Sequence, residues 1–188
     1  MSAHVAALRS RPGVFDHRFA AVWIATLLLF AVSVAVPGGL SRGAVLSMVP
    51  FASVLAVAAA GQTLVIQQRG FDFSVGGVFL LGTALVTNSS FWVGISLAIV
   101  VSACFGLLNG LAVTRIGIAP IVATLGTSAI ALGAARTISG GFAGRAPERL
   151  ADIVGAKTAG VPNIAIAALL VVAVVTMMLG RTTLGRRL

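Results

Sequence analysis

Polar side chains cluster in one short part of an otherwise apolar chain, between two apolar segments. Residues 61–79 read GQTLVIQQRGFDFSVGGVF and place Gln67, Gln68, Arg69, Asp72 and Ser74 in a row. A charged side chain at membrane depth costs roughly 2.5–3.5 kcal/mol on insertion scales. Such residues therefore lie at a membrane surface, pair with one another or face a polar cavity.

Two local geometries fit Arg69 and Asp72. On one helical turn, three residues apart, they would form an ion pair. If the chain instead breaks at Gly70 and restarts at Asp72, that carboxylate would cap the new helix, and Ser74 would add a second oxygen. The functional interpretation is a discontinuous helix near a translocation path or a moving interface. The structural interpretation is a short loop between two spans, with Arg69 among lipid headgroups.

Three further polar residues are candidates for the same path. Asn109 needs a hydrogen-bond partner in its apolar setting, and either a neighbouring helix or a solute would supply it. Thr124 and Thr127 can bond back to carbonyls of their own helix, so their polarity alone indicates no pore. Close helix packing is predicted for a ridge of small residues at four-residue steps, which let another helix approach: Ala98, Ser102, Gly106 and Gly110.

The sequence contains few residues of the types that catalysis or metal binding requires. The two histidines, His4 and His17, precede the first apolar run, and Cys104 is the single cysteine. Cys104 lies within an apolar run and is predicted to be a small core residue. Asp72 has no second acid, histidine or serine–base partner within the apolar runs. We therefore expect no enzyme activity, metal site or cofactor.

The composition fits an integral membrane protein. The mean hydropathy is +1.09 and 9% of residues are charged, whereas soluble chains contain about 25% charged residues. The net charge of +9 does not indicate a nucleic-acid partner, because no basic face carries aromatic residues at stacking intervals. The charge is interpreted as a signal of membrane topology.

Six apolar runs predict an all-α polytopic bundle of about six spanning or partly spanning helices. The runs at 73–86 and 120–135 are short for full spans, and Pro50 is expected to kink the second run. Residues 1–18 form a polar leader, and 19–188 form the membrane domain. The first run could also mimic a cleaved signal peptide, but its length favours an uncleaved span. The predicted runs are 19–36, 44–66, 73–86, 91–113, 120–135 and 163–179, with one sizeable loop at 139–162.

The distribution of basic residues favours a cytoplasmic amino terminus. With six crossings, five basic residues fall outside and eight fall inside. The outer set is Arg42, Arg136, Arg145, Arg149 and Lys157, and the inner set is Arg9, Arg11, Arg18, Arg69, Arg115, Arg181, Arg186 and Arg187.

Several motifs resemble those of permease subunits of bacterial ABC importers for ribose and related sugars. GQTLVI at 61–66 and GFDFSVG at 70–76 are similar to the family's G-M-T-L-V-I and G-I-D-L-S-V-G. GLLNGLAVT at 106–114, ATLGT at 123–127 and Gly140-Gly141 follow in the family's order. TTLGRRL at 182–188 is similar to its T-x-x-G-R segment. The resemblance covers roughly residues 40–188.

The resemblance implies import of a small sugar across the bacterial inner membrane, through a bundle embedded in membrane lipid. It also implies three kinds of partner: ABC ATPase subunits, a second permease subunit in a homo- or heterodimer, and a periplasmic sugar-binding protein. The sequence contains no G-x-x-x-x-G-K-[ST] motif, so ATP hydrolysis is expected in a partner subunit.

The chain departs from the family pattern at three places. Gln67-Gln68-Arg69 replaces small uncharged residues, and Leu132-Gly133 stands where several relatives carry Arg before Gly, with the arginine displaced to Arg136. The chain also stops at Leu188, before the family's cytoplasmic coupling segment. It is therefore expected to be an amino-terminal portion that does not bind the ATPase by itself. The alternative is a truncated, non-transporting membrane fragment with a structural or regulatory role.

Overall fold

The computed structural model describes residues 20–37, 39–142 and 144–181, and these residues are predominantly helical. The predicted leader, 1–18, and the closing motif at 182–188 lie outside the described residues. The chain divides into two compact units, residues 1–48 and 49–188. The first contains α2 (Ala20–Ala35), a helix with no buried residue, and the beginning of α3 (Arg42–Gln67), which continues as one helix through Pro50.

The prediction of an all-α membrane fold is confirmed. Four helical stretches among the described residues are long and apolar enough to cross a membrane, and two shorter apolar helices, α2 and α4, accompany them. In the second unit, the helices beyond α3 are α4 (Val75–Thr87), α5 (Phe91–Leu111) with its π-helical extension η2 (Ala112–Ile116), α6 (Pro120–Ser139) and α8 (Asn163–Arg181).

The end predicted for the fifth run was wrong, because α6 continues past Ala135 to Ser139. The run was expected to close at Arg136, but this side chain is exposed and does not interrupt the helix. The helix ends where Gly140 adopts a left-handed backbone with φ 62°, and the Gly140 N–H donates to the Arg136 carbonyl. Glycine adopts this conformation without a steric penalty, which makes it the usual residue just after a helix.

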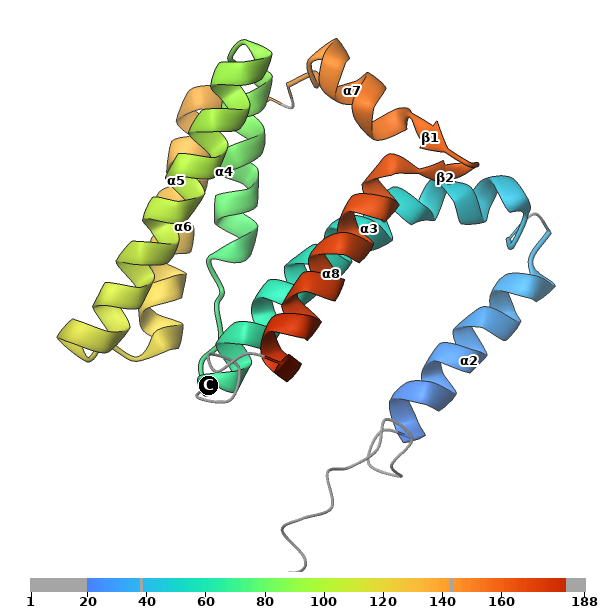
Figure 1. The fold of residues 1–188 in the computed structure, drawn as a ribbon, viewed down its shortest axis with the longest axis horizontal. Helices are drawn as coiled ribbons and strands as arrows, with labels where there is room; N and C mark the ends of the chain where they lie inside the picture. Colours follow the sequence, from blue (N-terminus) through green and yellow to red (C-terminus); the bar gives the residue numbers. More distant parts are fainter. Residues whose placement is uncertain (1–19, 38, 143, 182–188) are drawn as a thin grey trace, which may run out of the picture. The chain divides into compact units, whose positions relative to one another are not determined.

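Helices α4, α5 and α6 pack side by side and form the core of the second unit (Figure 1). Leu81, Ala84, Ala131 and Ala135 are the buried residues at the centre of this packing. α4 passes close to α6 at Gly77, where a Cβ atom would lie 2.5 Å from the Ser128 carbonyl oxygen. Small side chains thus allow the two backbones to approach closely, as in other membrane helix pairs.

The prediction of a single loop at 139–162 was incomplete, because this region contains secondary structure. It contains a short helix, α7 (Glu148–Gly155), and an antiparallel hairpin of β1 (Lys157–Thr158) and β2 (Val161–Pro162). The turn between the strands places Ala159 at φ 52° and Gly160 at φ 80°. Positive φ at both central residues is the mark of a type I′ turn, whose twist matches that of a hairpin.

Cys104 also differs from its prediction. It is exposed on α5 rather than buried in a core. An apolar helix in a membrane protein does not need to turn its apolar side chains inward, because lipid solvates them as well as a protein core would.

Candidate functional site

The polar residues around Asp72 lie at a break between α3 and α4. The N–H of Arg69 donates to the Ile66 carbonyl (2.9 Å), and the N–H of Gly70 donates to the Val65 carbonyl (3.1 Å). This pair of bonds, with Arg69 at φ 61°, forms a Schellman motif that closes the end of α3. The left-handed position usually holds glycine, because an L-residue there costs about 1–2 kcal/mol.

Residues 70–74 form no regular secondary structure, and exposed and buried side chains alternate along them. Phe71 and Phe73 lie on the outer side, 51% and 50% exposed. Asp72 is half-buried and Ser74 is 3% exposed on the other side. The alternation in the sequence F-D-F-S therefore separates an aromatic face from a polar one within a single short segment.

Asp72 organises the beginning of α4. Its Oδ1 accepts two hydrogen bonds from Ser74, one from the backbone N–H (2.7 Å) and one from the hydroxyl (2.6 Å). A carboxylate that accepts from the N–H two residues later forms an Asx turn, which satisfies a donor that the helix cannot. The helix itself begins one residue beyond Ser74, at Val75.

A buried side chain connects this break to the two neighbouring helices. Asn109 of α5 is 7% exposed, and its Nδ2 donates to Ser74 Oγ (3.0 Å). The hydroxyl of Thr127 in α6 donates to Asn109 Oδ1 (2.8 Å). One continuous chain of hydrogen bonds therefore links Asp72, Ser74, Asn109 and Thr127, and each link has a consistent donor and acceptor.

Two further contacts hold the break against the start of α6. The Thr124 hydroxyl donates to the Pro120 carbonyl (2.8 Å) and lies 3.4 Å from the Phe71 carbonyl oxygen. Gly70 is buried, and a Cβ atom there would lie 3.5 Å from Pro120 Cβ. The break is thus held by packing as well as by hydrogen bonds.

Of the two geometries left open by the sequence, the structure contains the break. No hydrogen bond or ion pair joins Arg69 to Asp72 among the described residues. Asp72 was expected to cap the new helix, but the residue at the cap position is Ser74, which donates to Asp72 Oδ1, and the helix restarts at Val75. The structure brings together Asp72, Ser74, Asn109, Thr124 and Thr127, whereas Arg69 ends α3 with an exposed side chain. Their role in a translocation path stays a prediction.

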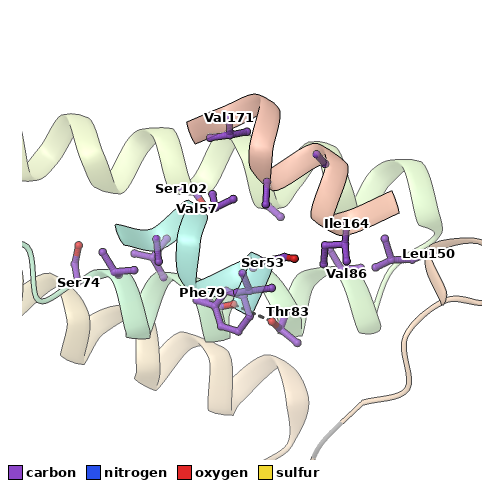
Figure 2. Close-up of a pocket in the computed structure, with 18 of the residues that line it drawn as sticks. Ser53, Val57, Ser74, Phe79, Thr83, Val86, Ser102, Leu150, Ile164 and Val171 are labelled. Carbon is purple, nitrogen blue, oxygen red and sulfur yellow. Dashed lines mark hydrogen bonds between the residues drawn. The ribbon is translucent and has the colours of Figure 1, made fainter. Parts of the chain in front are cut away.

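A cavity of about 750 Å³ lies beside the break and extends along α4. Figure 2 shows side chains around it that come from α3, α4, α5, α7 and α8, with Ser74 near one end and Leu150 near the other. Most of its wall is apolar, and the polar residues that line it are Ser53, Asp72, Ser74, Thr83, Thr87 and Ser102.

The small-residue ridge of α5 contributes to this wall. Ala98, Ser102 and Gly106 line the cavity, and a Cβ atom at Gly106 or Gly110 would meet nothing within 4 Å. The contact that α5 makes through the ridge is with α4, where a Cβ atom at Gly82 would lie 3.6 Å from Ala98 Cβ. Sequence reasoning missed the cavity-lining Thr83 and Thr87, whose four-residue spacing on α4 was the available signal.

A bundle of apolar helices, with a hydrogen-bonded polar segment between α3 and α4 beside a cavity, defines the class of protein. It is a polytopic helical membrane protein.

Comparisons with known proteins give the family. Residues 44–188 match the family described as branched-chain amino acid transport system, permease component, and the chain belongs to it. The probable ABC transporter permease protein y4mJ of Sinorhizobium fredii is 31% identical over 96% of this chain and 57% of its own length. The autoinducer 2 import system permease protein LsrC of Enterobacter is 33% identical over 92% of this chain and 52% of its own length.

A further relative is the fructose import permease protein FruF of Bifidobacterium longum, 29% identical over 79% of this chain and 44% of its own length. The chain thus spans about half the length of these relatives. No solved structure gives a significant match. The comparisons confirm the resemblance to ABC importer permeases that the sequence motifs indicated.

Proposed function

We propose that this chain forms part of the transmembrane subunit of an ABC importer that moves a small sugar across the bacterial inner membrane. The relatives described above are named as permeases, and one of them as a fructose import permease. The observation that carries the proposal is the helix break at 68–74, which places a carboxylate beside a cavity and ties it to α5 and α6.

The break supports the proposal because alternating access requires helices that can exchange hydrogen-bond partners, and the structure contains one set of such partners. With Asn109 bonded to both Ser74 and Thr127, α4, α5 and α6 hold one packing. Exchange of these partners for water or solute would release α4 from its neighbours, and alternating access needs two packings that differ by only a few kcal/mol. The ATPase subunits would then bias one packing over the other.

The partners follow from the same proposal. ATP hydrolysis belongs to separate ABC ATPase subunits, a periplasmic sugar-binding protein delivers the solute, and a second permease subunit completes the path. The excess of basic residues on one side supports a cytoplasmic amino terminus. In that orientation Arg115, in η2, lies near the cytoplasmic surface.

Substitution of Asp72 in the native host, where all partners are present, tests the proposal. Asp72→Asn keeps an oxygen that accepts from the Ser74 N–H, whereas Asp72→Ala removes it. We expect Asp72→Ala to reduce uptake of radiolabelled ribose or fructose far more than it reduces the amount of inserted protein. Asp72→Asn should separate the role of the charge from that of the cap.

Uptake of both sugars at the normal rate by the Asp72→Ala variant would reduce the break to a dispensable cap. Absence of uptake of either sugar by the unsubstituted chain in its host would contradict the proposal itself and favour a membrane protein with a structural or regulatory role.

A further inference from the structure

The hydroxyl groups on the cavity wall differ in whether they are already bonded. Those of Ser53, Thr83 and Thr87 donate to carbonyls of their own helices, and that of Ser74 donates to Asp72. Ser102 lines the same cavity, and its hydroxyl has no hydrogen-bond partner among the described residues. Its hydrogen and both lone pairs are therefore available inside the cavity.

Unpaired groups also gather where the cavity meets the break. Both bonds to Asp72 end on Oδ1, and Oδ2 has no partner among the described residues. The backbone N–H groups of Phe71, Asp72 and Phe73 likewise have no acceptor among the described residues, and of these three residues Asp72 lines the cavity. Lipid cannot satisfy such groups, and irregular backbone at membrane depth occurs only where protein buries it or where it lines a water-filled cavity.

From these groups we infer that the cavity along α4 is filled with water and forms this chain's wall of the solute route, with Ser102, Thr83 and Asp72 in contact with the solute. This inference rests on the proposed function. The solute class it fits is a neutral polyhydroxylated molecule. Ser102 can both donate and accept, the other wall hydroxyls and the free carboxylate oxygen can accept, and among the described residues no basic side chain lines the cavity to hold an anion.

The shape of the wall supports the same assignment. Ala98 and Gly106 flank Ser102 one helical turn away on either side, and all three line the cavity. Large side chains at these positions would occupy the space that a solute needs. The ridge that sequence reasoning assigned to helix packing is thus assigned to keeping the cavity open.

Cysteine accessibility tests the inference without knowledge of the solute. Cys104 is exposed on α5 but does not line the cavity, so the native chain supplies its own lipid-facing control. In a Cys104→Ala background, single Ser102→Cys, Thr83→Cys and Thr87→Cys variants place a thiol on the wall. Ile99→Cys serves as a second control, because Ile99 is exposed and does not line the cavity.

Each variant is treated in membranes with a charged methanethiosulfonate reagent, and the remaining free thiol is counted by a maleimide mass tag. The reagent reacts with the thiolate, which forms in water and not in lipid. We expect loss of the free thiol at positions 83, 87 and 102 and its retention at Cys104 and in the Ile99→Cys variant. Ribose or fructose should slow the reaction at position 102.

Uptake in the native host separates this inference from the proposed function. Ser102→Leu, which removes the free hydroxyl and narrows the cavity, should strongly reduce uptake, whereas Ser96→Leu on the same helix, away from the cavity, should not. Unreactive thiols at all three wall positions, with normal uptake in the Cys104→Ala chain, would overturn the inference and leave the proposed function intact. Reactive thiols without uptake of either sugar would show a wet cavity and overturn its role as a solute route.

Discussion

Asn109 carries the connection between three helices, so its replacement gives the most direct test of the site. Its side chain makes two hydrogen bonds, at 3.0 Å to Ser74 and 2.8 Å from Thr127. Hydrogen bonds between membrane helices contribute about 0.6 kcal/mol each on average, so the two bonds amount to about 1.2 kcal/mol. Asn109 is also 7% exposed, and truncation to alanine leaves a void that adds to the loss.

We therefore expect Asn109→Ala to lower the free energy of unfolding by about 2 kcal/mol, a roughly thirtyfold change in the ratio of folded to unfolded chains. Asn109→Leu fills the space and should cost about 1 kcal/mol, because it loses the bonds alone. Neither substitution leaves a hydrogen-bond donor without an acceptor. Ser74 still donates to Asp72, and the Thr127 hydroxyl still has the Ala123 carbonyl at 3.1 Å.

Unfolding of the purified chain in bicelles by sodium dodecyl sulfate, followed by tryptophan fluorescence, measures these differences. Thr114→Val is the matched control, because the Thr114 hydroxyl bonds only to the Gly110 carbonyl of its own helical segment (2.7 Å). It should change stability by less than about 0.5 kcal/mol. A double-mutant cycle of Asn109→Ala with Thr127→Val should give a coupling of about 0.6 kcal/mol. Zero coupling with both Thr127→Val and Ser74→Ala would refute the network.

Three further predictions follow from the backbone, each measured by the same unfolding assay unless stated. Gly77→Ala should destabilise by about 1–3 kcal/mol, because its Cβ would lie 2.5 Å from the Ser128 carbonyl oxygen; Gly76→Ala, in open space one residue earlier, should stabilise by up to about 1 kcal/mol. Arg69→Val should destabilise the chain by about 1 kcal/mol or more, since a β-branched residue fits φ 61° poorly. Arg69→Gly should be tolerated. Equal losses of stability in the two variants would show that the guanidinium group matters and the backbone conformation does not. Ala159→Asn should strengthen the type I′ turn, seen as slower amide hydrogen exchange at Thr158 and Val161; unchanged exchange would argue against that turn.

Most of the helices could be predicted from apolar runs, because each run is bounded by glycine, proline, polar residues or charge. The end of α6 was predicted too early, since the apolar run closes at the charged Arg136, whereas the helix stops at Gly140, four residues later. The helix α7 could not be separated from its loop. Its eight residues, ERLADIVG, are too few for a periodic pattern to be distinct from a loop.

The residues of the site could be predicted one by one, but their connections could not. Composition alone shows that Asn109 needs a partner. Its partners, Ser74 and Thr127, lie 35 and 18 residues away, and only the packing of α4, α5 and α6 brings them within reach. The role of the Ala98–Gly106 ridge was equally ambiguous, because small residues allow a helix to approach and also leave a cavity open.

The bonds that close the break between α3 and α4 have a consequence for how the chain is made. Those at Arg69 and Gly70 reach back no more than five residues, and those from Ser74 to Asp72 span two. Each can form as soon as this short segment has left the ribosome, before α5 or α6 has been synthesised. The hydrogen bonds that define the interruption between α3 and α4 therefore do not require α5 or α6, whereas those of Asn109 do.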